Sequence, residues 1–273
     1  MNRGSDVWCV LPLLETALTD VNAAKTLYDN EYYPQAMFLL QQAIEKGLKA
    51  VYVQNGIIAC NEIKNKVSHF PLKALPKILE KHLTQPSIKL PNKLFESVLQ
   101  ADTKFFLDTI GKLEETLKRW KEKPIHMLLN DEKVLNDVLK TCSEIPQKVK
   151  QTVEQILERF NKVLVNKEIF DVFLKIMKIK PEENLIQKIE KILNLIKPTI
   201  ITVFQCTAIL LALDAIFEQQ VEITRYPKTE KIGPKIYTKN KLLVKKFPKL
   251  CNMAKSALEK LYKNIPHNKM WKT

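Results

Sequence analysis

Apolar residues recur every three or four positions along most of the chain, and this spacing predicts helices throughout. The clearest case lies between residues 33 and 53, where the apolar positions share one helical face. Pro34, Pro146 and Pro181 are expected in first turns, where a proline costs little, and Pro248 is expected to start or interrupt the last helix. The expected helices cover residues 7–28, 33–53, 71–83, 92–120, 131–139, 146–160, 166–177, 181–196, 198–220 and 242–263.

The turn chemistry argues against strands. Only 5 glycines occur among 273 residues, whereas the tight hairpins of strand-rich folds favour glycine. The single Asn55-Gly56 pair follows a helical pattern and does not separate two alternating apolar runs. We therefore predict an all-α fold.

Two helices are expected to lie in the interior. Ala36, Ala43, Gly47 and Ala50 are small residues in the second helix and would let another helix approach closely. Residues 198–213 are strongly apolar, but this segment contains Gln205 and falls short of the roughly 20 apolar residues that span a bilayer. A buried central helix is the better interpretation, so no membrane partner is expected.

The five cysteines are far apart in the sequence and form no Cys-x-x-Cys pair. We therefore expect neither a zinc site nor a disulfide framework, but five reduced thiols, several of them in helix cores. No complete secretory signal opens the sequence, and a cytoplasmic location is expected. No metal and no cofactor is predicted.

Positive charge is concentrated at the C-terminal end. Residues 225–273 hold 14 basic and 2 acidic residues, a net charge of +12, whereas residues 1–224 carry a net charge of only +2. Acidic residues normally alternate with lysines on a solvated face, and here they are nearly absent. Tyr226, Tyr237 and Phe247 lie between the lysines, and such aromatic residues can stack on bases.

Three stretches resemble the HEPN family. The segment YYPQAMFLLQQAIEKGLKAVY (32–52) is similar to the family's second helix, and SHFPLKAL (68–75) is similar to the start of its third helix. The stretch TRYPKTEKIGPKIYTKN (224–240) resembles the Arg-Tyr-Pro loop before its final helix. The resemblance implies a HEPN-like four-helix up-and-down bundle made of residues 1–83 and 198–273. A multi-helix insertion at 84–197 would enlarge this bundle as an inserted helical lobe.

The resemblance also carries functional expectations. It implies a homodimer in a toxin–antitoxin or defence system, and a nucleotidyltransferase as a candidate partner protein. Many HEPN proteins are ribonucleases with an arginine followed by a histidine four to six residues later. Counted as intervening residues, only Arg119 and His126 match here, with six residues between them; Pro124 is one of these six, so we expect this match to be accidental.

We therefore predict a protein that binds nucleic acid or a nucleotide, with no catalytic residue assigned. His69 is a candidate functional residue, although a structural role in the loop before the third helix is favoured. Two alternatives remain open: a metal-independent ribonuclease, using Arg119 with His126 or His69 with Arg225, and a helical protein–protein interaction module. Phosphate contacts are expected from Arg225 and the residues around it, with Lys249 extending the set: Arg225, Tyr226, Lys228, Lys231, Lys235, Lys239, Lys241, Lys245 and Lys246.

Overall fold

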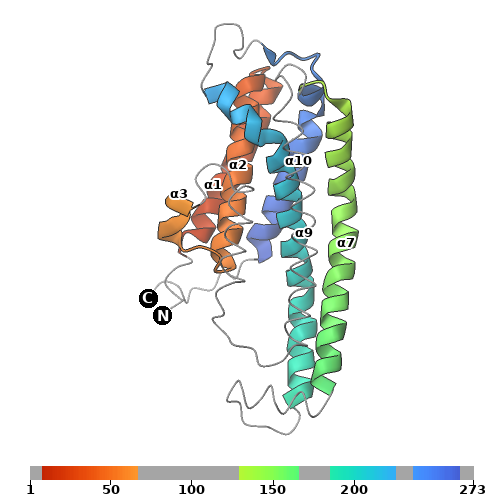
Figure 1. Cartoon of the computed structure of the whole chain (residues 1–273). Helices are drawn as coiled ribbons and strands as arrows, with labels where there is room; N and C mark the ends of the chain where they lie inside the picture. Colours follow the sequence, from red (N-terminus) through yellow and green to blue (C-terminus); the bar gives the residue numbers. More distant parts are fainter. Residues whose placement is uncertain (1–7, 67–128, 166–184, 226–235, 265–273) are drawn as a thin grey trace.

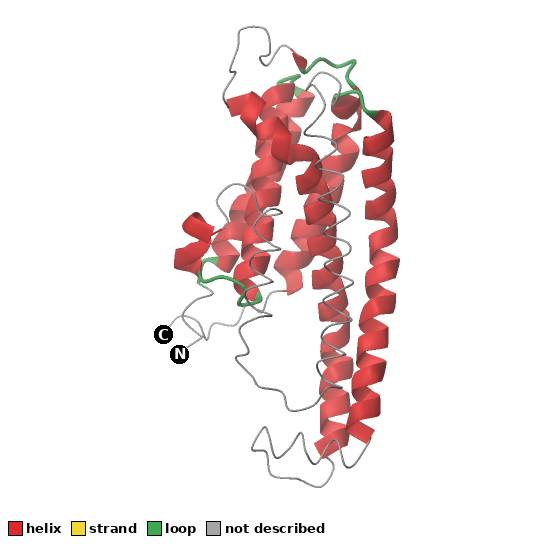
Figure 2. Cartoon of the chain, viewed as in Figure 1, coloured by secondary structure: helices red, strands yellow, loops and turns green. Residues whose placement is uncertain are grey.

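The fold is all-α, as the sequence predicts. The computed structural model describes residues 8–66, 129–165, 185–225 and 236–264, and this part of the chain contains helices and loops but no strand (Figure 2). The helices are α1 (Val10–Asp29), α2 (Tyr33–Gln54), the short 3-10 helix η2 (Cys60–Glu62), α3 (Ile63–Lys66), α7 (Glu132–Val165), α9 (Leu185–Arg225) and α10 (Leu242–Asn264).

Four of these helices pack around a common core. The helices α1, α2 and α10 pack together with the C-terminal half of α9, and α7 lies antiparallel along α9 (Figure 1). The α7–α9 pair extends beyond the end of the four-helix bundle (Figure 1). The core includes Leu14, Leu40, Phe217 and Leu258, all of which are fully buried. Burial of this apolar surface is the main stabilising contribution to the bundle.

The turn between α1 and α2 is a Schellman motif. The backbone N–H of Tyr32 donates to the carbonyl of Leu27 at 2.9 Å, and that of Glu31 donates to Tyr28 at 3.0 Å. Glu31 has a φ of 64°, the left-handed conformation that glycine usually supplies at this position. The motif reverses the chain in three residues and sets α2 against α1.

The end of α2 has the same geometry, and here a glycine, Gly56, occupies the left-handed position. The N–H of Ile57 donates to the carbonyl of Tyr52 and that of Gly56 to Val53, each at 2.9 Å. Gly56 has a φ of 66°, and nothing lies within 4 Å of the position that its Cβ would occupy. Glycine is needed here for its backbone conformation and not for space.

The small residues of α2 allow the close approach that the sequence predicts. A Cβ on Gly47 would lie 2.5 Å from Cδ2 of Leu258 and 3.1 Å from Cδ1 of Leu210. Both leucines are fully buried, one in α10 and the other in α9. The missing side chain at Gly47 therefore lets three helices meet at one level of the bundle.

Prolines do not divide the long helices, and here the predicted boundaries are wrong. Pro146 lies inside α7, Pro198 inside α9 and Pro248 inside α10. A proline inside a helix loses one backbone hydrogen bond and costs about 3 kcal/mol in isolated helices. Packing of α7 along α9 offsets this cost, and Gln205 Nε2 donates to the carbonyl of Pro146 at 2.6 Å across that contact.

A segment that lies more than a hundred residues earlier in the sequence caps the start of α10. The N–H of Leu243 donates to the carbonyl of Leu129 at 3.0 Å, and the N–H of Leu242 donates to Asn130 Oδ1 at 3.2 Å. Leu129 is itself fully buried in the core. Residues 129 and 130 thus satisfy backbone groups that the first turn of a helix otherwise leaves unpaired.

The proposed division into a bundle (1–83 and 198–273) and an inserted lobe (84–197) stays a prediction. Helix α9 runs without interruption across residue 198, so this boundary does not coincide with the end of a helix. Within the predicted lobe, the structure describes all of α7 and the first third of α9, residues 185–197. Helix α7 packs against α9.

Candidate polyanion-binding surface

Only part of the predicted binding set falls within the described residues. Arg225 is the last residue of α9, and the other described members lie just before α10 or in its first turns. Several predicted residues lie outside the described part of the chain: Tyr226, Lys228, Lys231, Lys235 and His69. The same is true of Arg119 and His126. We call the four described lysines the α10 basic surface: Lys239, Lys241, Lys245 and Lys246.

These lysines are accessible to solvent and have few acidic neighbours. Lys239 and Lys245 are exposed, and Lys241 and Lys246 are partly exposed. Lys239 Nζ lies 3.4 Å from Glu31 Oε1 in an exposed ion pair. Such a pair contributes little and is readily exchanged for another anion.

The position of these lysines opposes the helix dipole. The N-terminal end of a helix carries a partial positive charge, which favours acidic residues. The first turn of α10 has no acidic residue, and the whole helix carries six lysines and one acidic residue, Glu259. The positive potential at this end of α10 is therefore unrelieved by the helix itself, and an external anion would be stabilised there.

The aromatic residues between the lysines cannot stack on bases, and this part of the prediction is wrong for the two that are described. Tyr237 is 4% exposed and Phe247 is fully buried. Phe247 stacks on Tyr28 of α1, with ring centroids 4.8 Å apart, and burial raises the pKa of the Tyr237 hydroxyl well above its usual range. Both residues anchor α10 to the bundle, so neither ring is available to an external ligand.

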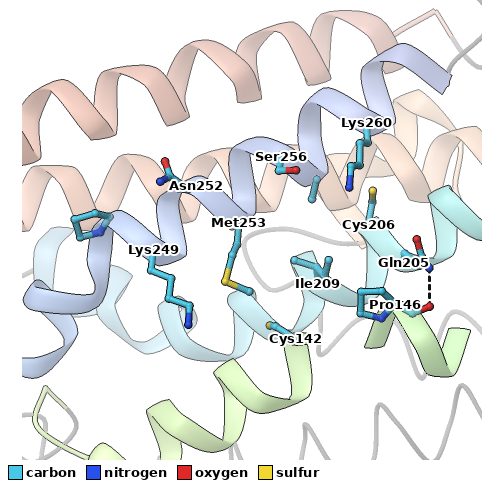
Figure 3. A pocket seen from close by; sticks show the side chains of 12 residues that line it. Cys142, Pro146, Gln205, Cys206, Ile209, Lys249, Asn252, Met253, Ser256 and Lys260 are labelled. Atoms are coloured by element: carbon cyan, nitrogen blue, oxygen red, sulfur yellow. Dashed lines mark hydrogen bonds between the residues drawn. The ribbon is translucent and has the colours of Figure 1, made fainter. Parts of the chain in front are cut away.

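A groove continues this surface along α10. It encloses about 670 Å³ between α7, α9 and α10, and its described lining residues include Lys249 and Lys260 but none that is acidic. In Figure 3 the two lysines lie on either side of Met253, with Ile209 of α9 opposite. The volume lies in the range of ligand-binding clefts, roughly 300–1,000 Å³.

Two thiols line the groove but are not poised as nucleophiles. Cys142 of α7 and Cys206 of α9 are both buried. Burial raises the pKa of Cys142 to about 12 and that of Cys206 to about 11, although Lys249 and Lys260 respectively lower them in part. Both thiols stay protonated at neutral pH, and only the thiolate is an effective nucleophile.

A buried polar cluster on α2 does not open onto this groove. Glu45 Oε1 and Lys49 Nζ form an intrahelical ion pair at 2.6 Å, and Gln42 donates to the same carboxylate at 3.2 Å. Glu45 is only 3% exposed. Glu45 and Lys49 therefore satisfy each other inside the bundle, which indicates a structural role. In the described part of the chain, no group of His, Cys, Asp and Glu residues could hold a metal ion.

Comparison with known proteins supports the N-terminal part of the resemblance. Residues 10–65 match the HEPN domain. This match covers α1, α2, η2 and nearly all of α3, and we call it the HEPN region. No curated protein and no solved structure matches the chain. The resemblance of residues 224–240 lies outside the match and stays a prediction, although α9 and α10 both pack on the HEPN region.

A disulfide closes the HEPN region, contrary to the expectation of five reduced thiols. Cys9, next to α1, is bonded to Cys60 of η2, with their Cα atoms 6.0 Å apart and a sequence separation of 51. The antiparallel packing of α1 on α2 brings these two ends together. Cys142, Cys206 and Cys251 are free and buried, as expected for thiols in helix cores.

Helix α9 is long and apolar enough to cross a membrane. The segment Leu185–Phe217 contains a window with a mean hydropathy of 2.2, of which 56% is buried inside the protein. From Cys206 to Phe217 nearly every side chain is buried against the HEPN region and α10, including Asp214. The apolar composition of this half is therefore explained by its place in the bundle core, because a buried core helix can be as long and as apolar as a helix that crosses a membrane.

Three exposed hydrogen-bond donors of the groove were not predicted from the sequence. Asn252, Ser256 and Lys260 line it together with Lys249. Their spacing of three or four residues was visible in the sequence and places them on one face of α10. The wall formed by α7 could not be foreseen, because Pro146 was expected to start a helix and not to lie within one.

Proposed function

We propose that this chain is a HEPN-containing protein that binds nucleic acid or a nucleotide, with the α10 basic surface as the main contact. The observation that supports the proposal is the placement of lysines around the positive end of α10, whose first turn contains no acidic residue. Arg225 and the neighbouring residues Tyr226, Lys228, Lys231 and Lys235 are proposed to extend this surface. Lysine acts as a point charge, so many contacts share the affinity.

The test is a binding titration with labelled single-stranded RNA, single-stranded DNA and duplex at two salt concentrations. The surface variant has Lys239, Lys241, Lys245 and Lys246 changed to Gln. We expect single Lys→Gln changes to weaken binding little, and the fourfold change to weaken it by roughly a hundredfold near physiological salt, because each lost phosphate contact also reduces the salt dependence.

A matched control loses the same charge elsewhere. Four exposed lysines of α7 and α9 are changed to Gln: Lys133, Lys150, Lys188 and Lys191. This control should bind nearly as well as the parent. Equal losses of affinity in both variants would show that binding depends on net charge and not on the α10 basic surface. Absence of binding by the parent would contradict the proposal.

The cellular setting is part of the same proposal. A HEPN region supports a homodimer in the cytoplasm, with membership of a toxin–antitoxin or defence pair and a nucleotidyltransferase as partner. Light scattering of the purified chain tests the dimer, and co-purification with the product of a neighbouring gene tests the partner. A strictly monomeric chain that recovers no such product would remove this part of the proposal.

Binding without catalysis is the favoured form of the proposal. A metal-independent ribonuclease is the alternative, with Arg119 and His126 or His69 and Arg225 as its candidate residues. Incubation of RNA with the protein in the presence of a chelator separates the two. Cleavage that is lost in both His126→Ala and Arg119→Ala would establish the ribonuclease, whereas RNA that is shifted but intact supports binding alone.

A second candidate function, a protein–protein interaction module, is favoured by one observation. Ile192 and Leu195 lie three residues apart on one side of α9 and are 56% and 78% exposed. Large apolar side chains on an exposed helix face are typical of contacts with a partner chain. Changing Ile192 and Leu195 to Ser should abolish co-purification of a partner under this hypothesis and leave nucleic-acid binding unchanged.

A further inference from the structure

Four hydrogen-bond donors form a stripe along the groove side of α10. Lys249, Asn252, Ser256 and Lys260 all line the groove and are exposed. Among the described residues, none of these four side chains forms a hydrogen bond or an ion pair. They are spaced by three or four residues, so successive donors are separated by roughly 4.5–6 Å along the helix axis and the whole stripe spans roughly 16 Å.

The rest of the groove is largely apolar. Pro146 of α7, Ile209 of α9 and Met253 and Ala257 of α10 form its floor and opposite wall. The polar side chain of Gln205 is engaged with the carbonyl of Pro146. A ligand that fits this groove therefore has regularly repeated acceptor groups on one edge and flat or apolar groups on the other.

We propose that the groove holds a single strand of nucleic acid, with its phosphates along the donor stripe and its bases over the apolar floor. This inference rests on the proposed function and specifies its ligand. Lysine, asparagine and serine are all common donors to phosphate oxygens. Bases can lie over the apolar floor only when they are unpaired, so the groove suits a single strand better than a duplex.

The groove is continuous with the α10 basic surface. Lys245 lies one helical turn before Lys249 and is exposed. A strand can therefore run from the N-terminal end of α10 along the stripe to Lys260. An acidic peptide would place only isolated carboxylates there and would leave much of the stripe unused.

The composition of the groove sets the expected selectivity. Aromatic side chains add roughly 1–3 kcal/mol per stacked base in single-strand binding sites, and none of the described residues that line this groove is aromatic. We therefore expect binding that is tolerant of base sequence and strongly dependent on salt. RNA and DNA share the phosphate chemistry, so both are used as separate arms of the test.

The test compares two pairs of lysines on the same helix. Lys249→Gln/Lys260→Gln removes the charges at both ends of the groove, whereas Lys255→Gln/Lys263→Gln removes two charges of α10 outside it. Binding of twelve-nucleotide RNA, the corresponding DNA and a twelve-base-pair duplex is measured by fluorescence anisotropy. The helical content of each variant is checked by circular dichroism.

We expect the groove pair to weaken single-strand binding about tenfold and to lower the salt slope by about 1.4, the value for two lost contacts. The control pair and duplex binding should change far less. Equal losses in the two pairs, with binding still weakened roughly a hundredfold in the fourfold surface variant, would overturn the groove while preserving the proposed function. No binding of any nucleic acid by the parent would overturn both. A 4-thiouridine oligonucleotide should also cross-link to the peptide that contains Met253, and a cross-link confined to other peptides would contradict the groove.

Discussion

Two residues adopt the same left-handed conformation at equivalent helix ends, and they make a matched pair. Glu31 and Gly56 each follow the last turn of a helix, with φ values of 64° and 66°. The left-handed conformation costs a residue with a Cβ roughly 1–2 kcal/mol, and glycine avoids this cost. The first helix end is therefore strained and the second is not.

We expect Glu31→Gly to stabilise the protein by up to about 1 kcal/mol and Gly56→Ala to destabilise it by about 1 kcal/mol. No atom lies near the position of a Cβ on Gly56, so the second effect comes from the backbone alone. Urea unfolding measures both. Glu31→Gln is the control, because it removes the ion pair with Lys239 and keeps the strain; a gain as large as that of Glu31→Gly would attribute the effect to charge.

At the scale of elements, the contact of α2 with α9 and α10 depends on the absence of one side chain. A methyl group on Gly47 would overlap Leu258 and press on Leu210. Overpacking of this kind costs about 1–3 kcal/mol, whereas alanine improves helix propensity by about 1 kcal/mol over glycine. The two effects oppose each other, and the packing term is the larger.

We therefore expect Gly47→Ala to destabilise the protein by about 1 kcal/mol, and to do so only while Leu258 is present. In a Leu258→Ala background the same change should be neutral or stabilising, because the cavity accepts the methyl group. Denaturant unfolding of the four proteins in this cycle measures the coupling. A Gly47→Ala effect that is the same in both backgrounds would show that the clash is relieved by other means.

The described helices were predictable, because three- and four-residue apolar spacing is a local property of the sequence; the helices expected at 71–83, 92–120 and 166–177 lie outside the described residues. The boundaries at Pro146 and Pro198 were not, because packing between α7 and α9 compensates for a local defect. The lysines of the α10 basic surface were likewise visible in the sequence. The burial of Tyr237 and Phe247 was not, because it depends on how α10 meets α1.

At the scale of the whole molecule, the disulfide ties the two ends of the HEPN region together. A cross-link that closes a loop of this length restricts the unfolded chain and can contribute about 4 kcal/mol in the chain-entropy model. The HEPN region packs against α9 and α10, so the gain applies to the bundle as a unit. In a reducing compartment this contribution would be absent.

Reduction should therefore lower the free energy of unfolding by up to about 4 kcal/mol. Cys9→Ser should have a similar effect, and dithiothreitol should then have no further effect on that variant. Alkylation of the oxidised, denatured chain should label three cysteines, and all five only after reduction. Five labelled cysteines without reductant would show that Cys9 and Cys60 are free thiols.

The cap that Leu129 and Asn130 place on α10 bears on whether the middle of the chain is dispensable. An appendage can be removed without loss only if the remaining protein has no unpaired backbone group or exposed core at the cut. Here excision would uncover the N–H groups of Leu242 and Leu243 and would leave a gap where Leu129 is fully buried. The bundle and the predicted insertion at 84–197 are therefore expected to melt in a single cooperative transition. A shortened chain that lacks residues 84–197 would need a new N-cap before α10 could begin at Leu242.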